Sequence, residues 1–443
     1  MVVNPPLRDC QTKALEIASE QDRFGFFFDT GTGKTRTACA IIAHDLWAGG
    51  GNWLVVTPRS VIPGWLEECR RWVIPGWSPT PTLLTRRGLV CQGWGGKKET
   101  LIREMNAAET TVTICNPESL KRLGNKKFHG LVVDESAIMQ NEKAQITRSL
   151  IKLALWADRV YLLSGNPSPN GPLYLWSQAH VLGAFSGKWW AWANLWGYQD
   201  KFRKWTLRKG NDEKILEMMR PSCWYLDKAD VLDLPPVSVI KREFIPSAGG
   251  DTWKALVEAV RAEGLGCVMR WRTEASGFYY LTEKDATGKT KRVGTHVGHT
   301  DRLDALRQLL TELAGRKIVI WFQFSESERQ IKDLLAEMVL PFTDDPEWFK
   351  GSLFDVLLAH PRSIGKGTDG LQHLAQDMIF YEISYSYDEY YQCLSRLHRS
   401  GQERPVAVYM LIASGSVDEE ALKAIENKED LADRLRRALG RTA

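Results

Sequence analysis

The sequence lacks the features of a secreted, membrane-bound or zinc-stabilised protein. Its eight cysteines are scattered, with no C-x-x-C pair and no histidine at zinc-ligand spacing, so neither a disulfide scaffold nor a structural zinc site is expected. No run approaches the roughly 18 apolar residues of a membrane span, and the first residues do not combine positive charge with an apolar run. We therefore expect reduced thiols, no membrane insertion and a cytoplasmic location.

The sequence also has little net charge and no low-complexity block. Its 58 Lys and Arg residues against 54 Asp and Glu leave a formal charge of +4, so a nucleic-acid partner would have to be held by a local basic track. Apolar residues at 44% and charged residues at 25% are typical of a folded protein with a large core. A length of 443 residues predicts two large domains or about three smaller ones.

Short apolar runs alternate with amphipathic stretches along the chain, which predicts βαβ units and mostly parallel sheets. The prolines of LDLPP (Leu232 to Pro236) interrupt regular structure and predict a boundary between domains at residues 1–235 and 236–443. A hairpin is expected around residues 277–293. The expected strands lie at residues 24–28, 53–57, 111–115, 130–134 and 159–165 in the first half, and at 317–322, 354–360, 377–382 and 406–411 in the second.

Tryptophan is unusually common, with 18 residues, and several of them gather in KWWAWANLW (Lys188 to Trp196). This stretch belongs to a Trp-rich insertion at about residues 183–225. Exposed tryptophans at this density could stack on nucleic-acid bases. We favour the other interpretation, an aromatic mini-core beneath a long insertion.

The run DTGTGKT (Asp29 to Thr35) follows an apolar strand and opens a helix, as a phosphate-binding loop requires. Gly31 and Gly33 would let backbone N–H groups approach phosphates at the positive end of that helix. Lys34 would reach the β- and γ-phosphates, and the Thr35 hydroxyl would hold Mg²⁺. The G-x-x-x-x-G-K-T pattern is incomplete because position 28 is Phe, but the context supports the prediction. A second run, residues 286–290, has no helix after it and is predicted to be a hairpin turn.

Two carboxylates end the apolar run at residues 130–134 and could serve a phosphate-binding loop. Asp134 would hold Mg²⁺ in place, and Glu135 would polarise the attacking water. An Asp-Glu pair alone is often only a solvated turn, but this pair follows a buried strand and accompanies the loop above.

Two arginines in the second half, Arg396 and Arg399, lie three residues apart and would share one face of a helix. Beside a nucleotide they would act as arginine fingers that stabilise transferring phosphate. A basic helix is otherwise more often a solvated surface, so the assignment depends on the motifs that surround it.

The order of these motifs resembles the superfamily two helicase-like ATPases, and within them the Swi/Snf-type DNA translocase branch. The resemblance covers nearly the whole chain. Its most specific segments are Gln392 to Gln402, which is similar to motif VI of the branch, and Asp227 to Pro236, which is similar to its inter-lobe segment. Residues 162–170 resemble motif III, which couples hydrolysis to lobe movement.

The resemblance implies further site residues. Gln11 would read adenine, and Thr30, Gly31, Thr32, Gly33, Lys34 and Thr35 would bind the nucleotide. Nucleic acid would be contacted by Thr57, Pro58, Arg59 and Trp65 of motif Ia, by Gln323 of motif IV, and by Gly367 and Thr368 where motif V should be.

Three segments depart from the family pattern. Motif II ends in Ala137, where relatives carry a residue able to form hydrogen bonds, and motif III has Asn166 in place of Thr. Thr368 to Gly370 replace the usual motif V core. These departures bear on how hydrolysis is coupled to movement, whereas Lys34, Asp134 and Glu135 are intact.

The resemblance implies two RecA-like doubly wound parallel-sheet lobes of the α/β class with an ATP cleft between them. ATP and Mg²⁺ would be the cofactors, Lys34, Glu135, Arg396 and Arg399 the catalytic residues, and double-stranded DNA the track. It favours a short bacterial or phage motor, a monomer that acts alone or with a protein partner. Two other functions stay open: a strand-separating helicase on DNA or RNA, with residues 277–293 as its wedge, and an ATP-gated nucleic-acid binding module without motor activity.

Overall fold

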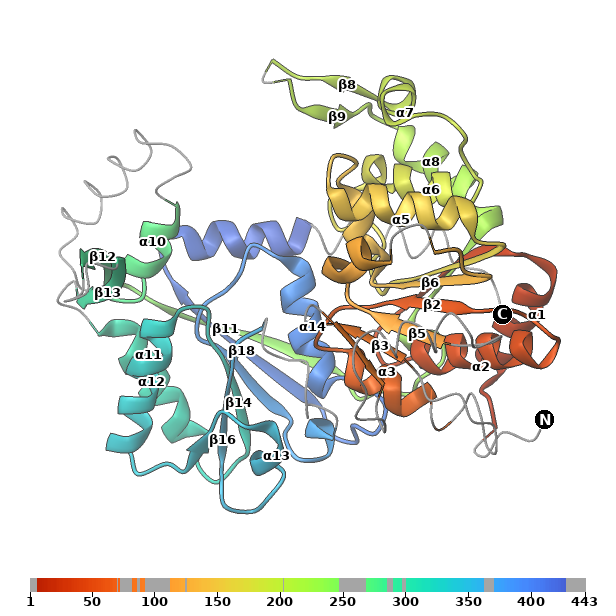
Figure 1. The fold of residues 1–443 in the computed structure, drawn as a ribbon. Helices are drawn as coiled ribbons and strands as arrows, with labels where there is room; N and C mark the ends of the chain where they lie inside the picture. Colours follow the sequence, from red (N-terminus) through yellow and green to blue (C-terminus); the bar gives the residue numbers. More distant parts are fainter. Residues whose placement is uncertain are drawn as a thin grey trace. The chain divides into compact units, whose positions relative to one another are not determined.

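The computed structural model describes residues 6–69, 71, 82–85, 88–91, 112–123, 126–201, 203–246, 268–284, 290–296, 300–361 and 370–427. The chain divides between Leu232 and Asp233 into two compact units (Figure 1). Among the described residues, no helix has the length and apolarity needed to cross a membrane. Six cysteines of this part are thiols that are not joined in disulfides, as the sequence predicted.

The first unit is built on an eight-stranded sheet in the order β10-β1-β7-β6-β2-β5-β3-β4. Every pairing is parallel except that of β3 with β4. The strands are β1 Arg23–Phe28, β2 Trp53–Val56, β3 Thr82–Thr85, β4 Gly88–Cys91, β5 Val112–Cys115, β6 Gly130–Asp134, β7 Arg159–Leu163 and β10 Cys223–Leu226.

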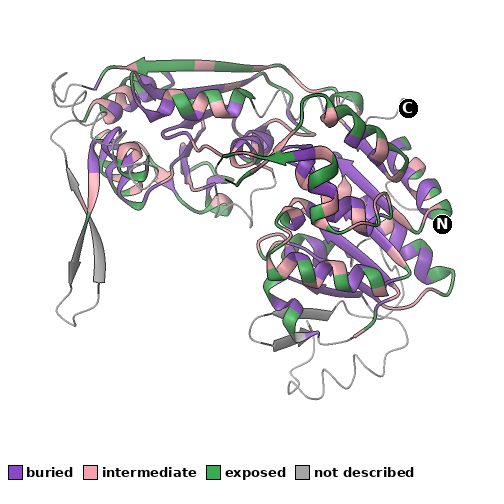
Figure 2. Ribbon diagram, turned by 90° about the horizontal axis from the view of Figure 1, so that it is seen from above, coloured by how far each residue is buried: buried purple, intermediate pink, exposed green. Residues whose placement is uncertain are grey.

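Helices cover both faces of this sheet because successive strand side chains point to opposite faces. In β1, Phe24, Phe26 and Phe28 join the core that includes α2, while Phe27 joins the core that includes α5 and α6. The buried strands and the exposed outer faces of the helices can be followed in Figure 2. The helices of this unit up to the insertion are α1 Asp9–Glu20, α2 Lys34–Trp47, α3 Ile62–Glu68, α5 Gln145–Trp156 and α6 Trp176–Val181, with short 3-10 helices η2 Pro117–Arg122, η3 Ser136–Gln140 and η4 Pro172–Leu175.

The second unit has a six-stranded sheet in the order β11-β18-β17-β14-β16-β15, parallel throughout. The predicted α/β class with two mostly parallel sheets is therefore confirmed. Its strands are β11 Val237–Phe244, β14 Ile318–Trp321, β15 Phe342–Thr343, β16 Val356–Ala359, β17 Asp377–Phe380 and β18 Val406–Ala413, and its helices include α10 Val268–Glu274, α11 Asp301–Glu312, α12 Ser325–Glu337, α13 Pro346–Phe349 and α14 Tyr387–Leu397.

A hairpin of β12 (Phe278–Lys284) and β13 (Thr290–His296) precedes α11, which confirms the hairpin expected near residues 277–293. The two strands pair in antiparallel register from Phe278 opposite His296 to Lys284 opposite Thr290. The run at residues 286–290 thus reaches the start of β13, and its first four residues lie outside the described part of the chain.

The Trp-rich insertion forms α7 (Trp189–Trp196), a hairpin of β8 (Gly197–Gln199) and β9 (Trp205–Leu207), and α8 (Asn211–Met219). Trp192 is fully buried, packs edge-on against Phe185, and donates its indole N–H to the Leu173 carbonyl at 2.8 Å. Trp190, two residues away, is 62% exposed. The mini-core interpretation is therefore confirmed for Trp192, whereas Trp190 faces solvent.

The two tryptophans give a matched test of this arrangement. Trp192→Ala should lower the free energy of unfolding by about 3 to 5 kcal/mol, because it leaves a cavity and an unpaired carbonyl. Trp190→Ala should change it by less than about 0.5 kcal/mol, since an exposed side chain is removed. Urea unfolding followed by fluorescence measures both, and equal losses would contradict the burial described above.

Candidate active site

The predicted site residues of the first unit gather where parallel strands end. The strands β1, β7 and β6 are neighbours in the sheet, so the loops that follow them emerge at one edge. A Cβ atom built on Gly165, in the loop after β7, would lie 3.5 Å from the Thr30 side chain and 3.7 Å from Lys34 Nζ in the loop after β1. The edge therefore brings the predicted phosphate loop and motif III into contact.

The loop between β1 and α2 has the geometry of a phosphate cradle. Gly31 and Gly33 have φ of 83° and 95°, a region that residues with side chains rarely adopt. Thr32 is buried and donates its hydroxyl to the Asp29 carbonyl at 2.7 Å, which closes the turn. The loop leads into the 14-residue helix α2, whose N-terminus favours an anion. These features fit a nucleotide phosphate.

The Lys34 ammonium lies at the end of β1, where it donates to the carbonyls of Phe28 at 2.9 Å and Asp29 at 3.2 Å. The side chain is half-buried, and it turns back from the first residue of α2 across the mouth of the loop. Thr35 is the second residue of the same helix and is also half-buried. A cation and a hydroxyl in these positions match the donor set that Mg²⁺ and nucleotide phosphates require.

Gln11 lies against the back of the same loop and is only 2% exposed. Its Nε2 donates to the Gly33 carbonyl at 3.3 Å, and its Oε1 accepts from the Arg8 backbone at 3.0 Å. A Cβ at Gly33 would approach Gln11 Nε2 to 2.6 Å, so a larger residue there would displace the Gln11 amide, and the positive φ favours glycine in addition. In this structure Gln11 braces the loop. Its predicted contact with adenine stays a prediction.

Asp134 ends β6 as a buried carboxylate, 7% exposed, with hydrogen bonds from two directions. Its Oδ2 accepts from the Thr57 hydroxyl at 2.9 Å and from the Trp65 indole N–H at 2.7 Å. Its Oδ1 accepts from the Glu135 backbone N–H at 3.1 Å. The donors fix the carboxylate plane, which is the requirement for a preorganised metal ligand.

Glu135 has φ 54° and ψ 56°, the left-handed conformation. Such a backbone costs on the order of 1 to 3 kcal/mol for a residue with a side chain and persists only where neighbours hold it. The conformation places the second predicted catalytic carboxylate at the turn from β6 into η3. Local strain of this kind is typical of functional positions.

Two of the four motif Ia residues predicted to contact nucleic acid are fully buried in this structure. Thr57 and Trp65 each have 0% exposure, and their polar atoms are used by Asp134. Pro58 is half-buried, and Arg59 is exposed. In this structure Thr57 and Trp65 support the predicted metal ligand, and their expected contact with nucleic acid stays a prediction.

Sequence reasoning missed Gln178 on α6, which joins motifs II and III. Ser136 donates its hydroxyl to Gln178 Oε1 at 3.0 Å, and Gln178 Nε2 donates to the Pro167 carbonyl at 2.6 Å. The methyl side chain of Ala137 is unable to make such a link. Ser136, the residue before Ala137, makes the link instead. Its partner Gln178 is fully buried and belongs to no local sequence motif.

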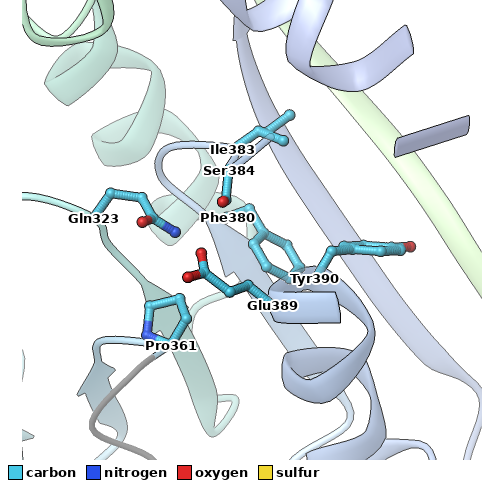
Figure 3. A pocket seen from close by; sticks show the side chains of 7 residues that line it. All are labelled: Gln323, Pro361, Phe380, Ile383, Ser384, Glu389 and Tyr390. Carbon is cyan, nitrogen blue, oxygen red and sulfur yellow. The ribbon is translucent and has the colours of Figure 1, made fainter. Parts of the chain in front are cut away.

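In the second unit, Gln323 follows β14 and lines a small pocket at the ends of β14, β16 and β17 (Figure 3). Its backbone N–H donates to Glu382 Oε2 at 2.8 Å, and burial raises the pKa of that carboxyl. Figure 3 shows the side chains of Gln323 and Glu389 approaching one another across the pocket. The Glu389 carboxylate disfavours a phosphate deep in the pocket. The nucleic-acid contact expected for Gln323 stays a prediction.

Arg396 lies in the last turn of α14, and Arg399 follows the helix. Both are half-buried. The helix ends at Leu397, so Arg399 lies beyond it and the expected shared helical face is absent. Gln402 holds the following turn, with its Nε2 donating to the Ala375 carbonyl at 3.0 Å and the Leu397 carbonyl at 3.3 Å. Gly367 and Thr368 lie outside the described residues.

Comparisons with known proteins show which family the chain resembles. A family model described as the SNF2-related domain matches residues 15–250, more than half of the chain. The chain is 25% identical to the mouse SWI/SNF-related matrix-associated actin-dependent regulator of chromatin subfamily A member 1, across 96% of this chain and 43% of the mouse protein. It is 23% identical to an uncharacterized ATP-dependent helicase of Mycoplasma pneumoniae, across 94% of this chain and 40% of that protein.

A phage relative is similar in length. Putative protein p41 of Acyrthosiphon pisum secondary endosymbiont phage 1 is 23% identical across 71% of this chain and 73% of p41. Among solved structures, the Sulfolobus solfataricus SWI2/SNF2 ATPase core in complex with dsDNA matches 99% of this chain and 97% of its own, with 18% identity and a TM-score of 0.43. The chain spans less than half the length of the mouse and Mycoplasma relatives.

The hydrogen bond from Trp65 to Asp134 can be tested against a matched bond in the same unit. Trp53 is equally buried and donates its indole N–H to Asp45 at 2.8 Å, away from the loops described above. Trp65→Phe and Trp53→Phe should each lower the free energy of unfolding by roughly 1.5 to 3 kcal/mol, since each removes a hydrogen bond to a charged group. Only Trp65→Phe should also raise the Mg²⁺ concentration needed for binding of a fluorescent ATP analogue. An equal Mg²⁺ dependence in the two variants would show that Trp65 does not position Asp134.

Proposed function

The chain belongs to the SNF2-related domain family of helicase-like ATPases, and from that premise we propose that it is a DNA-stimulated ATPase that moves along double-stranded DNA. The family predicted from the motifs is thereby confirmed. The observation that best supports the proposed function is the sheet edge of the first unit, where the phosphate cradle, a fixed buried carboxylate and Glu135 follow neighbouring strands.

ATP would be held by the first unit. The backbone of Thr30 to Gly33 and the Lys34 ammonium bind its phosphates, with the Thr35 hydroxyl and the Asp134 carboxylate as the ligands of Mg²⁺. Bound Mg²⁺ neutralises charge on the phosphate oxygens. Glu135 orients the attacking water and accepts its proton. Gln11 adds a contact to adenine in this proposal.

Arg396 and Arg399 would complete the site from the second unit. Their guanidinium groups would stabilise charge on the transferring phosphate only when the two units close on ATP. Because closure depends on ATP, each cycle of hydrolysis can move one unit relative to the other along a bound strand. The strand would be contacted by Pro58, Arg59, Gln323, Gly367 and Thr368.

Double-stranded DNA is the favoured track because the motifs resemble the DNA translocase branch and the relatives include a SWI/SNF-related regulator of chromatin. The β12–β13 hairpin supports one alternative, strand separation, because a hairpin of this kind can act as a wedge. Retention of Glu135 disfavours the other alternative, a binding module without turnover. We place the protein in the cytoplasm of a bacterial cell or phage-infected host, as a monomer with or without a protein partner. The phage and Mycoplasma relatives support that location.

The proposal is tested by steady-state ATP hydrolysis without nucleic acid and with duplex DNA, single-stranded DNA or RNA at one salt concentration. We expect duplex DNA to stimulate hydrolysis most. Glu135→Gln should bind ATP and abolish turnover, while Glu213→Gln, which changes an exposed carboxylate of the same unit, should match the parent protein. Stimulation by single strands or RNA alone would favour the helicase, and absence of hydrolysis would favour the binding module.

Arg399 has a matched control in Arg404, an exposed arginine in the same segment. Arg399→Ala should lower kcat by about 10³-fold or more and leave the affinity for DNA unchanged, because the guanidinium acts on the transition state. Arg404→Ala should leave kcat within about twofold of the parent. Equal effects of the two substitutions would remove Arg399 from the active site.

A further inference from the structure

A marked excess of positive charge in the first unit lies in the insertion, at residues 188–209, here called the basic hairpin segment. It contains six Lys and Arg residues and one carboxylate, Asp200, for a net charge of +5. Because the whole chain carries only +4, all other residues together sum to −1. A polyanion can therefore be attracted to this segment even though the chain as a whole carries little net charge.

All six cations are exposed. They flank or occupy the β8–β9 hairpin, whose strands pair from Gly197 opposite Leu207 to Gln199 opposite Trp205. Asp200 accepts from the Lys204 backbone N–H at 2.9 Å and so forms part of the turn. The cations are Lys188, Lys201, Arg203, Lys204, Arg208 and Lys209.

Hydrogen bonds hold both ends of the segment in place in the first unit. Trp192 fixes α7 to the Leu173 carbonyl, and Asn211 Nδ2 donates to the Trp196 carbonyl at 3.0 Å at the far end of the hairpin. Arg208 NH1 donates to the Asn194 and Leu195 carbonyls at 2.8 and 3.1 Å, which closes the end of α7. Figure 1 shows α7 and the hairpin at the end of the first unit, beyond α6. Because the backbone around the hairpin is already ordered, binding has to order only the side chains themselves.

Exposed aromatic side chains accompany the charge. Trp190 is 62% and Tyr198 is 48% exposed, both within the basic hairpin segment. Aromatic rings among Lys and Arg are typical of surfaces that bind nucleic acid, because the cations contact phosphates while the rings pack on sugars or bases. An acidic protein could also pair with the cations and cover the rings. DNA is the favoured occupant because the proposed function already gives this protein a DNA track.

We propose that the basic hairpin segment binds the phosphate backbone of duplex DNA, at a place separate from the contacts predicted at motifs Ia, IV and V. This inference rests on the proposed function, since the DNA would be the track of the same motor. Phosphate contacts carry no sequence information, so the binding is sequence-tolerant and weakens steeply with salt. Leu173, which accepts the anchoring hydrogen bond from Trp192, lies in η4, eight residues after Gly165. The hairpin and the nucleotide loops both belong to the first unit.

The test neutralises three exposed lysines of the segment in the triple variant Lys188→Gln, Lys204→Gln and Lys209→Gln. Its control, Lys121→Gln, Lys127→Gln and Lys143→Gln, removes three exposed lysines of the same unit outside the segment. Binding of labelled duplex DNA, single-stranded DNA and RNA is measured by fluorescence anisotropy over a range of salt concentrations. Thermal melting reports whether both variants are folded.

The hairpin variant should bind duplex DNA about tenfold or more weakly than the parent at moderate salt. The slope of log affinity against log salt should become shallower by about 0.9 for each phosphate that the variant no longer neutralises, while the control keeps the parent's slope. Equal binding by the two variants would overturn the inference and would make an acidic protein the better occupant. Weaker binding confined to single strands or RNA would also overturn it.

The same measurements separate this inference from the motor. If the parent's ATP hydrolysis is stimulated by duplex DNA and the two triple variants bind alike, the hairpin inference is wrong and the proposed function stands. If duplex DNA does not stimulate hydrolysis, yet its binding depends on the three hairpin lysines, the hairpin inference stands and the proposed motor does not. A parent protein that binds no nucleic acid would overturn both.

Discussion

The burial of one carboxylate, Asp134, is the constraint on which the first unit depends. A buried charge must be compensated, and here compensation comes from a hydroxyl after β2, an indole on α3 and the next backbone N–H. Thr57 and Trp65 both follow β2, and the parallel pairing of β2 with β6 brings them to Asp134. The fold and the site therefore depend on one another: a strand order that separated β2 from β6 would leave the carboxylate with the Glu135 N–H alone.

Local patterns in the sequence were sufficient to predict features formed by residues close together in the chain. The strands are continuous apolar runs because parallel strands are covered on both faces, and the phosphate loop is a short run between a strand and a helix. The supports of Asp134 and the Gln178 link could not be found in this way. Thr57 and Gln178 lie far along the chain from the residues they serve, and their roles follow from strand order, which the sequence alone does not show.

In the second unit, too, local sequence patterns identified residues but not their surroundings. Four of its six strands were predicted, and β11 and β15 were missed. The helix before Arg399 ends two residues early, at Leu397, so a spacing of three did not place both arginines on one helical face. Gln323 was predicted from a motif, yet the structure sets it across a pocket from Glu389. In both cases the residue was identified from its motif, whereas its surroundings depended on residues elsewhere in the fold.

The left-handed backbone at Glu135 has an evolutionary consequence. Glycine would adopt this conformation without strain, so the fold alone has no reason to retain a glutamate there. Mutation combined with selection for heat resistance alone would tend to replace it, because glycine relieves the strain. Under the proposed role of Glu135, such a replacement would give a more durable protein without turnover, so stability and activity make opposite demands on this position.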